Sequence, residues 1–106
     1  MASNMKIAIA VTTADADAQI EVRGARAAYY LIIDTESGRS ETAANPAAQT
    51  ERAAGPTAAA FLINTGVTRV IAGDFGPRFR AELEAAGITC ELNTGKAADV
   101  IKQLDA

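Results

Sequence analysis

The stretch from Gly66 to Gly87, GVTRVIAGDFGPRFRAELEAAG, decides the fold. Its first part, Val67 to Gly73, is rich in β-branched residues and predicts a strand. Gly76-Pro77 then predicts a helix start, because proline fits the first helical position, where its missing N–H has no partner to lose. The helix is predicted to end at Gly87, since glycine readily adopts the left-handed conformation of a C-terminal cap.

The same arrangement occurs earlier in the chain. Gly55-Pro56 is followed by Gly66, and Gly76-Pro77 is followed by Gly87 at the same spacing. Successive helix–strand units of this kind predict parallel strands joined by right-handed crossovers. The other predicted elements are strands over Met5–Thr12, Ala28–Thr35, Ser40–Ala44 and Ile88–Leu92, a long loop over residues 13–27 and a last helix from about Lys96.

The order of these elements defines the fold class. Ala28–Thr35 and Ser40–Ala44 flank a turn over residues 36–39, which predicts an antiparallel hairpin with its polar second strand at a sheet edge. The prediction is an α/β fold: a three-layer α/β/α domain with a mixed five-stranded sheet. The 106 residues fit one domain over 1–106, with residues 1–4 as a loose leader.

Composition limits the core and indicates the location of the protein. Alanine accounts for 25 residues, and Leu, Ile, Val and Phe together for 22, so we expect a thin core with close alanine contacts. No apolar run reaches the roughly 18 residues of a membrane span. The first apolar stretch, Ile7 to Val11, is too short for a secretory signal. The sequence therefore predicts a cytoplasmic protein without a membrane partner.

Net charge and missing residue types exclude several functions. The formal net charge is −3, whereas nucleic-acid binding needs a basic surface, so we predict no nucleic-acid partner. The chain has no histidine, which removes Ser-His and Cys-His nucleophiles and histidine metal sites. Its one cysteine, Cys90, excludes an internal disulfide and a multi-cysteine metal site. The position of Cys90 within a predicted strand favours burial.

Two alternative functions remain open at this point. Four aspartates fall near predicted strand ends, where carboxylates of an α/β protein could hold Mg²⁺ for phosphoryl hydrolysis. They are Asp15, Asp17, Asp34 and Asp74. The first strand has no acidic residue and the aspartates share no recognisable spacing, so turn and cap roles are favoured. The polar edge strand Ser40–Ala44 could instead pair with a partner protein.

An anion receptor is the site that the residues favour. Two arginines flank a flexible glycine in the predicted loop, and arginines beside exposed backbone N–H groups bind anions. The two Gly-Pro helix starts add positive dipole ends, with further arginines beside them and phenylalanines for an apolar wall. The candidate binding residues are Arg23, Gly24, Arg26, Arg52, Gly55, Phe75, Gly76 and Arg78, with Phe79 in the wall.

Several pieces of the chain, spread from Lys6 to Leu104, form one recognisable pattern. They are the opening MKIAIAV, the block RGARAAYY at Arg23–Tyr30, Asn45-Pro46, Ala54-Gly55-Pro56 and, most specifically, the stretch from Gly66 to Gly87. With these pieces the chain resembles the dinitrogenase iron–molybdenum cofactor biosynthesis family of small accessory and carrier proteins. The resemblance implies a ribonuclease-H-like fold and non-enzymatic binding of a metal–sulfur cluster or cofactor precursor.

The resemblance also implies a cargo and partners. Orange-protein members of the family hold an anionic molybdenum–copper sulfide cluster without covalent ligation, and others act in iron–molybdenum cofactor assembly. The implied ligand is therefore a molybdenum–copper or iron–molybdenum sulfide cluster, and the implied partners are cluster-assembly or acceptor proteins. Family members commonly have F-G-R-A where this chain has Gly24-Ala25-Arg26-Ala27; Arg26 matches and the two positions before it do not.

Two positions that can carry metal ligands in the family hold other residues here. Many members place a histidine before the A-G-P helix start, where this chain has Arg52. Some place a cysteine two residues before the next G-P, where this chain has Asp74. We therefore expect an anionic cluster to be held by arginines and backbone N–H groups rather than by coordinate bonds.

Overall fold

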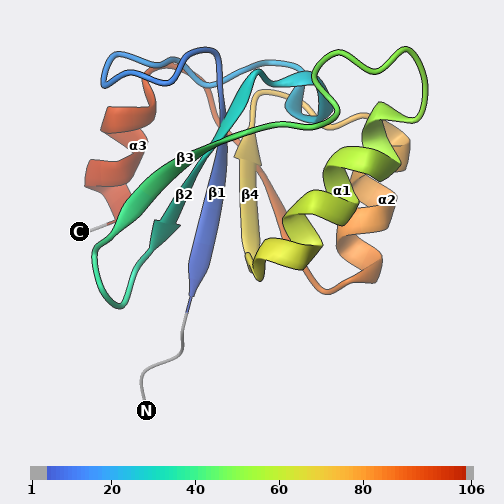
Figure 1. The fold of residues 1–106 in the computed structure, drawn as a ribbon. Coiled ribbons are helices and arrows are strands. Elements are labelled where there is room, and N and C mark those ends of the chain that lie inside the picture. The colour runs from blue at the N-terminus through green and yellow to red at the C-terminus, as the bar shows by residue number, and fades with distance from the viewer. Residues whose placement is uncertain (1–4, 105–106) are drawn as a thin grey trace.

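A mixed five-stranded sheet lies at the centre of the structure (Figure 1). The computed structural model describes residues 5–104, so the predicted leader over residues 1–4 lies outside the described residues. The strands are β1 (Lys6–Val11), β2 (Tyr29–Asp34), β3 (Ser40–Ala44), β4 (Arg69–Ala72) and β5 (Thr89–Leu92). Their order across the sheet is β3-β2-β1-β4-β5, with β3 at an edge as predicted.

The strand directions confirm the two predicted kinds of connection. β2 is antiparallel to both β1 and β3, which makes the predicted hairpin. β1 pairs with β4, and β4 with β5, in parallel register. A helix precedes both β4 and β5, and parallel pairing needs a long crossover of this kind.

β1 is the central strand and is buried on both faces. The side chains of Ile7, Ile9 and Val11 belong to one core, whereas those of Ala8 and Ala10 belong to the other. None of the five exposes more than 1% of its surface, which is why β1 is continuously apolar rather than alternating. The two alanines leave room for helices to pack closely on their side of the sheet.

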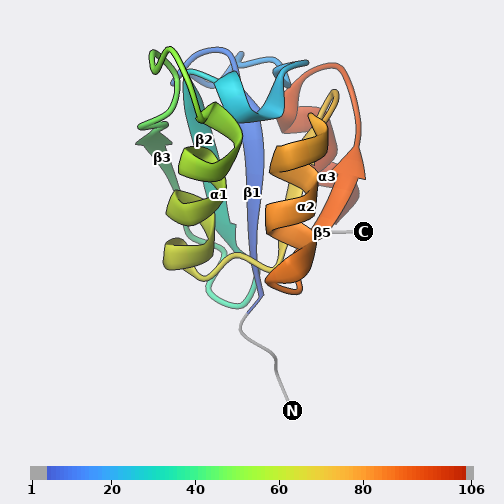
Figure 2. The same ribbon diagram turned by 90° about the vertical axis from the view of Figure 1, so that its right-hand side faces the viewer.

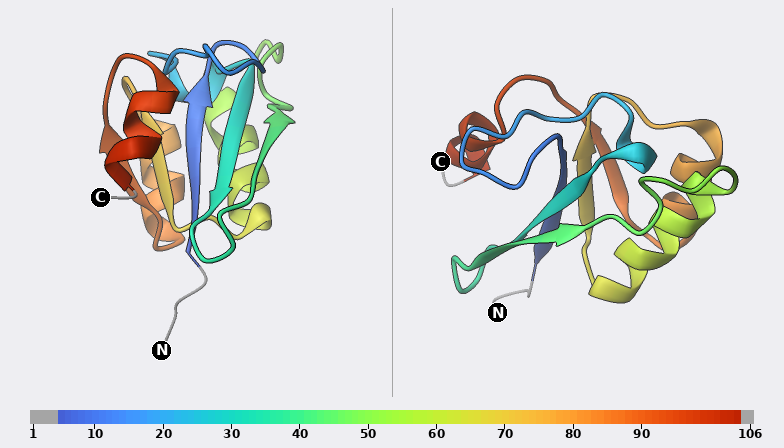
Figure 3. Two further views of the ribbon diagram at one scale, coloured as in Figure 1. Left: turned by 90° about the vertical axis from the view of Figure 1, so that its left-hand side faces the viewer. Right: turned by 45° about the horizontal axis from the view of Figure 1, so that its top comes forward.

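Three helices complete the layers. α1 (Ala54–Thr65) and α2 (Pro77–Ala85) cover one face of the sheet, and α3 (Ala97–Leu104) covers part of the other face (Figures 2 and 3). α1 and α2 approach closely because Gly55 has no side chain: a Cβ atom there would lie 3.0 Å from the backbone nitrogen of Phe79. The predicted three-layer order is confirmed, while the ribonuclease-H-like relationship stays a prediction. Within residues 5–104, no helix is long and apolar enough to cross a membrane.

The element boundaries follow the glycines closely but not completely. Gly66 and Gly87 have left-handed φ angles of 84° and 82°, as expected of residues that end helices. α1 begins one residue before Gly55, at Ala54, after Ala53 adopts a left-handed φ of 59°. β4 spans Arg69–Ala72 and is shorter than the predicted strand over Val67 to Gly73; the N–H of Gly73 donates to the carbonyl of Glu21 in the loop before β2.

The long loop between β1 and β2 is fastened to the ends of two strands. The N–H of Glu21 donates to the carbonyl of Ala10, and the N–H of Gly73 donates to the carbonyl of Glu21, at 2.8 and 2.9 Å. The N–H of Gly24 donates to the carbonyl of Asp74 at 3.1 Å. Residues Gly24–Arg26 then form a single 3₁₀ turn, η1. η1 lies at the same end of the sheet as the first turns of α1 and α2 (Figure 2).

We expect Gly73→Ala to destabilise the fold, because the added Cβ would lie 2.7 Å from the Cα atom of Val22. Backbone must move to relieve that contact, at a cost of about 1–3 kcal/mol in the free energy of unfolding. Urea denaturation measures this loss. Gly76→Ala is the matched control, since a Cβ there meets nothing within 4 Å and the φ of Gly76 is −64°. A Gly73→Ala protein as stable as the control would show that the loop contact is not tight.

Candidate functional site

A cavity of about 310 Å³ opens where η1 meets the first turns of α1 and α2. Three segments that are far apart in the sequence supply its walls, and Figure 2 shows η1 above the upper ends of the two helices. The lining residues are Arg23, Ala25, Arg26, Ala54, Gly55, Asp74, Gly76, Pro77, Arg78 and Phe79. We call this cavity the anion pocket, after the anion site that the sequence predicts.

Both helix starts present uncapped N-terminal turns to the anion pocket. Neither α1 nor α2 has a side-chain cap among the described residues, and neither carries an acidic residue in its first turn. The first backbone N–H groups of a helix have no partner within the helix. Together with the helix dipole, these groups favour an anion in the cavity that Gly55 and Gly76 both line.

Three arginines and one aspartate supply the charged groups of the pocket. Arg23 and Arg78 are exposed, whereas Arg26 is half-buried. The guanidinium of Arg26 donates to the carbonyl groups of Thr50 and Glu51, which fixes it against the segment before α1. A guanidinium has five N–H donors, so these two bonds leave others for a ligand.

Asp74 is the one acidic side chain of the anion pocket. Three guanidinium groups against one carboxylate leave the lining with a formal charge of +2. The chain as a whole carries −3, so the pocket is a local reversal of the protein's charge. An arrangement of this kind concentrates anions at one place on an otherwise acidic protein.

The structure brings together five of the eight predicted binding residues. They are Arg23, Arg26, Gly55, Gly76 and Arg78, and the predicted wall residue Phe79 joins them. Gly24 is buried behind the cavity wall, where a Cβ would lie 3.0 Å from the Cβ of Ala72 and 3.1 Å from the Cε2 of Phe79. Glycine is therefore needed there for packing.

The other two predicted residues lie apart from the cavity lining. Phe75 is buried, and its ring stacks on that of Phe79 with 5.6 Å between the centroids, so it supports the wall from behind. The guanidinium of Arg80 lies 5.4 Å from the centroid of the Phe75 ring. Arg52 is exposed and does not line the anion pocket.

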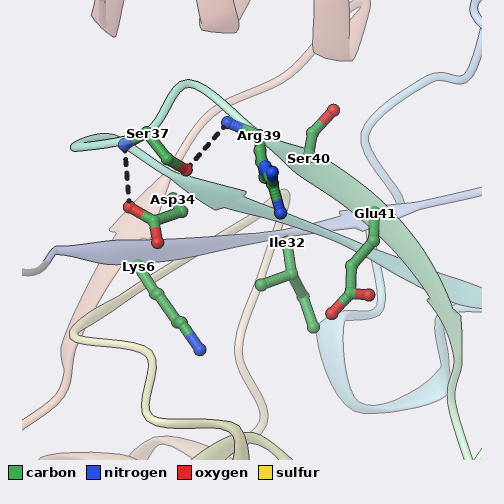
Figure 4. A pocket seen from close by; sticks show the side chains of 7 residues that line it. All are labelled: Lys6, Ile32, Asp34, Ser37, Arg39, Ser40 and Glu41. Atoms are coloured by element: carbon green, nitrogen blue, oxygen red, sulfur yellow. Dashed lines mark hydrogen bonds between the residues drawn. The ribbon is translucent and has the colours of Figure 1, made fainter.

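A second cavity, of about 250 Å³, lies at the opposite end of the sheet beside the β2–β3 turn (Figure 4). Its Asp34 carboxylate accepts hydrogen bonds from the backbone N–H groups of Glu36 and Ser37, so it shapes the turn. Asp34 and Asp74 therefore lie at opposite ends of the sheet and cannot share a metal ion. Among residues 5–104 no group of three or more acidic, cysteine or histidine side chains could hold one.

Cys90 lies outside the anion pocket, on the edge strand β5. It is half-buried rather than enclosed, because β5 has a neighbour on one side only. Burial raises the pKa of the Cys90 thiol, the nearby Arg80 lowers it, and Glu84 raises it further. The net effect is upward, which favours the neutral thiol over the thiolate that binds metals.

Two buried polar side chains behind η1, Tyr30 and Asn45, belong to the family pattern in the sequence but were given no role there. The hydroxyl of Tyr30 donates to the carbonyl of Gly24 at 2.6 Å. The amide of Asn45 donates to the carbonyls of Ala25 and Ala27 at 2.9 and 2.8 Å. Asn45-Pro46 was visible only as part of a family pattern, and no local signal connects it to η1.

The comparison with family models assigns the chain to a family. Residues 5–106 match the family model described as dinitrogenase iron-molybdenum cofactor. The chain belongs to this family. A comparison with curated proteins finds no match.

Solved structures of this family's fold resemble the chain over most of its length. The apo form of the orange protein from Desulfovibrio gigas is 26% identical with a TM-score of 0.85, covering 97% of this chain and 89% of that one. A putative NifB protein from Thermotoga, assigned to the DUF35 family, is 30% identical with a TM-score of 0.81, covering 95% and 87%. A putative dinitrogenase from Methanocaldococcus jannaschii is 18% identical with a TM-score of 0.66, covering 98% of this chain and 89% of that one. At this identity the likeness supports the fold alone.

We expect Cys90 of this family member to react slowly with iodoacetamide. Because burial raises the pKa of the thiol, less thiolate is present at a given pH, and the midpoint of the pH–rate profile should lie above that of an ordinary thiol. Stopped-time alkylation followed by mass spectrometry measures the profile. The same chain unfolded in urea is the control, and a folded midpoint at or below the unfolded one would contradict the expectation.

Proposed function

We propose that the chain binds and carries an anionic metal–sulfur cluster or cofactor precursor in the anion pocket, without coordinate bonds from the protein and without catalysing a reaction. The observation that carries the proposal is the meeting of two uncapped helix starts with Arg23, Arg26 and Arg78 around one cavity. Membership of a family named for the iron-molybdenum cofactor makes a metal–sulfur anion the favoured cargo.

The donor set of the pocket suits such a cargo. The lining residues offer guanidinium groups, backbone N–H groups and the ring of Phe79, but no cysteine and no histidine. A thiometallate or sulfide cluster brings its own sulfide ligands, so the protein needs to supply positive potential, hydrogen-bond donors and an apolar wall. A bare metal cation would instead need carboxylate, thiolate or imidazole ligands, of which the pocket has only Asp74.

Two kinds of interaction would hold the cargo in the pocket: hydrogen bonds from the arginines and the positive ends of the two helix dipoles. A hydrogen bond to a charged partner contributes about 1.5–3 kcal/mol, with the lower end expected for the exposed Arg23 and Arg78. Each helix start adds about 0.3–1 kcal/mol, and up to about 2 kcal/mol where it is partly buried. The loss of translational and rotational freedom on association, which costs about 4–15 kcal/mol, opposes these contributions, so they favour reversible rather than permanent binding.

The proposal includes partners that the structure does not contain. A carrier receives its cargo from one protein and gives it to another, so we expect cluster-assembly or acceptor proteins to be its partners. We expect the cargo to be a molybdenum–copper or iron–molybdenum sulfide cluster, and the exchange to take place in the cytoplasm. No feature of the described residues favours the hydrolase or the edge-strand interaction over this role.

Charge reversal in the pocket should weaken binding of a thiometallate anion. We expect Arg23→Glu and Arg78→Glu each to lower the affinity for tetrathiomolybdate, with or without copper, about tenfold, which corresponds to about 1.4 kcal/mol. Arg26→Glu should act at least as strongly, because that side chain also holds Thr50 and Glu51. Titration followed by visible absorption measures the affinities, and raising the salt concentration should weaken binding to the unchanged chain.

Arg39→Glu is the matched control for these variants. It makes the same change in net charge at the far end of the sheet, beside the second cavity, and should leave the affinity almost unchanged (Figure 4). Cys90→Ser should also retain binding, because Cys90 lies outside the pocket. Loss of the complex in Cys90→Ser but not in Arg23→Glu would show that a thiolate holds the cluster and would overturn the proposal.

Removing the acidic group of the pocket should have the opposite effect. Asp74→Asn keeps the size of the side chain but takes away the charge that opposes an anion, so we expect binding about two- to fivefold tighter, the range of a partly screened charge interaction. The same titration measures the gain, and it should shrink at high salt. Weaker binding in Asp74→Asn would show that the carboxylate itself contacts the metal of the cargo.

A further inference from the structure

The segment that carries Arg23 and Arg26 is held from behind by buried donors. Tyr30 exposes none of its surface, and its hydroxyl donates to the carbonyl of Gly24 at 2.6 Å. Its ring stacks against Phe61 beneath η1, with 6.3 Å between the centroids. Burial raises the pKa of the Tyr30 hydroxyl well above its ordinary value, so the group remains a proton donor at every working pH.

Asn45 is the second of these donors and joins two walls of the site. It is 5% exposed and, apart from Tyr30 with its hydroxyl, is the one buried polar side chain within residues 5–103. Its amide nitrogen donates to the carbonyls of Ala25 and Ala27, and its amide oxygen accepts the N–H of Ala47 at 2.9 Å. These bonds link η1 to the segment that leads to α1.

The same two segments meet again through Arg26. Its guanidinium donates to the carbonyls of Thr50 and Glu51, a few residues after Asn45. Two sets of hydrogen bonds thus join η1 to residues 45–51: those of Asn45 at the start of that segment and those of Arg26 at its end. Three of the carbonyls of residues 24–27 point at buried donors, so this backbone has little freedom to turn.

We infer that Tyr30 and Asn45 are positioning residues of the anion pocket, which hold η1 so that Arg23 and Arg26 are aimed at the ligand before it arrives. The inference rests on the proposed function. Neither side chain lines the cavity, so both act through the arginines. If the arginines are already held in place, ligand binding costs less conformational entropy, because fewer side-chain and backbone motions remain to be frozen.

The test compares affinity with stability in four proteins: the unchanged chain, Tyr30→Phe, Asn45→Ser and Val100→Ala. Tyr30→Phe removes one hydroxyl and keeps the ring, and Asn45→Ser removes at least one of the two amide donations. Val100→Ala is the matched control, because Val100 is 3% exposed and belongs to the core on the other face of the sheet. Urea denaturation gives the loss of stability, and tetrathiomolybdate titration at a temperature where all four are folded gives the affinity.

We expect binding to weaken about three- to tenfold in Tyr30→Phe and about tenfold in Asn45→Ser, with less than a twofold change in Val100→Ala at a similar loss of stability. The salt dependence of binding should also become shallower in the first two variants, because fewer arginine contacts form. A role in stability alone would move neither quantity beyond the control. If Asn45→Ser does not fold, Tyr30→Phe still decides.

The outcomes separate this inference from the proposed function. If the unchanged chain binds tetrathiomolybdate, and the affinities of Tyr30→Phe and Asn45→Ser fall no further than that of Val100→Ala, the inference alone is overturned. No binding of tetrathiomolybdate to the unchanged chain, with or without copper, overturns the proposed function and the inference with it. Selective loss of affinity and of salt dependence in the two site variants supports both.

Discussion

The backbone contact between residues 21–24 and the end of β4 determines where the candidate site lies. Gly73 donates to the carbonyl of Glu21, and Gly24 donates to the carbonyl of Asp74. A Cβ atom at either glycine would meet neighbouring atoms at about 3 Å or less, so the two segments can approach only because side chains are missing. Without this contact Arg23 and Arg26 would belong to a free surface loop, and of the three arginines of the pocket only Arg78 would remain beside the helix starts.

The fold could be predicted because local rules determine most of it. Each Gly-Pro pair lies within two residues of the first residue of a helix, and glycine follows the end of α1 and of α2. The continuous apolar run of β1 indicated a strand buried on both faces. The misplaced boundaries have tertiary causes. β4 ends before Gly73 because the N–H of Gly73 donates to the carbonyl of Glu21 in the loop. Cys90 is only half-buried because β5 is an edge strand, which depends on strand order rather than on the residues around it.

The site could be predicted in part, for a topological reason. The starts of α1 and α2 lie at the same end of the sheet, and this brings Gly55 and Gly76, both predicted as binding residues, to one cavity. Arg52 lies apart because Ala53 turns the chain in a left-handed conformation before α1 begins. The roles of Tyr30 and Asn45 had no sequence signal, since a hydrogen bond to the backbone of a distant segment leaves no spacing or composition pattern.

The chemistry of the pocket bears on release as much as on capture. Under the proposed function, the cargo keeps all of its sulfide ligands and gains only hydrogen bonds and Coulomb attraction from the protein. An acceptor that offers thiolate or imidazole ligands therefore breaks no metal–protein bond when it takes the cluster. The barrier to transfer is then the cost of separating the anionic cluster from the arginines of a partly solvated cavity. Asp74 lowers that barrier, because its carboxylate opposes the anion from within the lining. The rigid support behind η1 has the opposite effect and favours capture, because the arginines are already in place and binding orders them at little entropic cost. The affinity then depends on the balance between these preorganised donors and the one opposing charge.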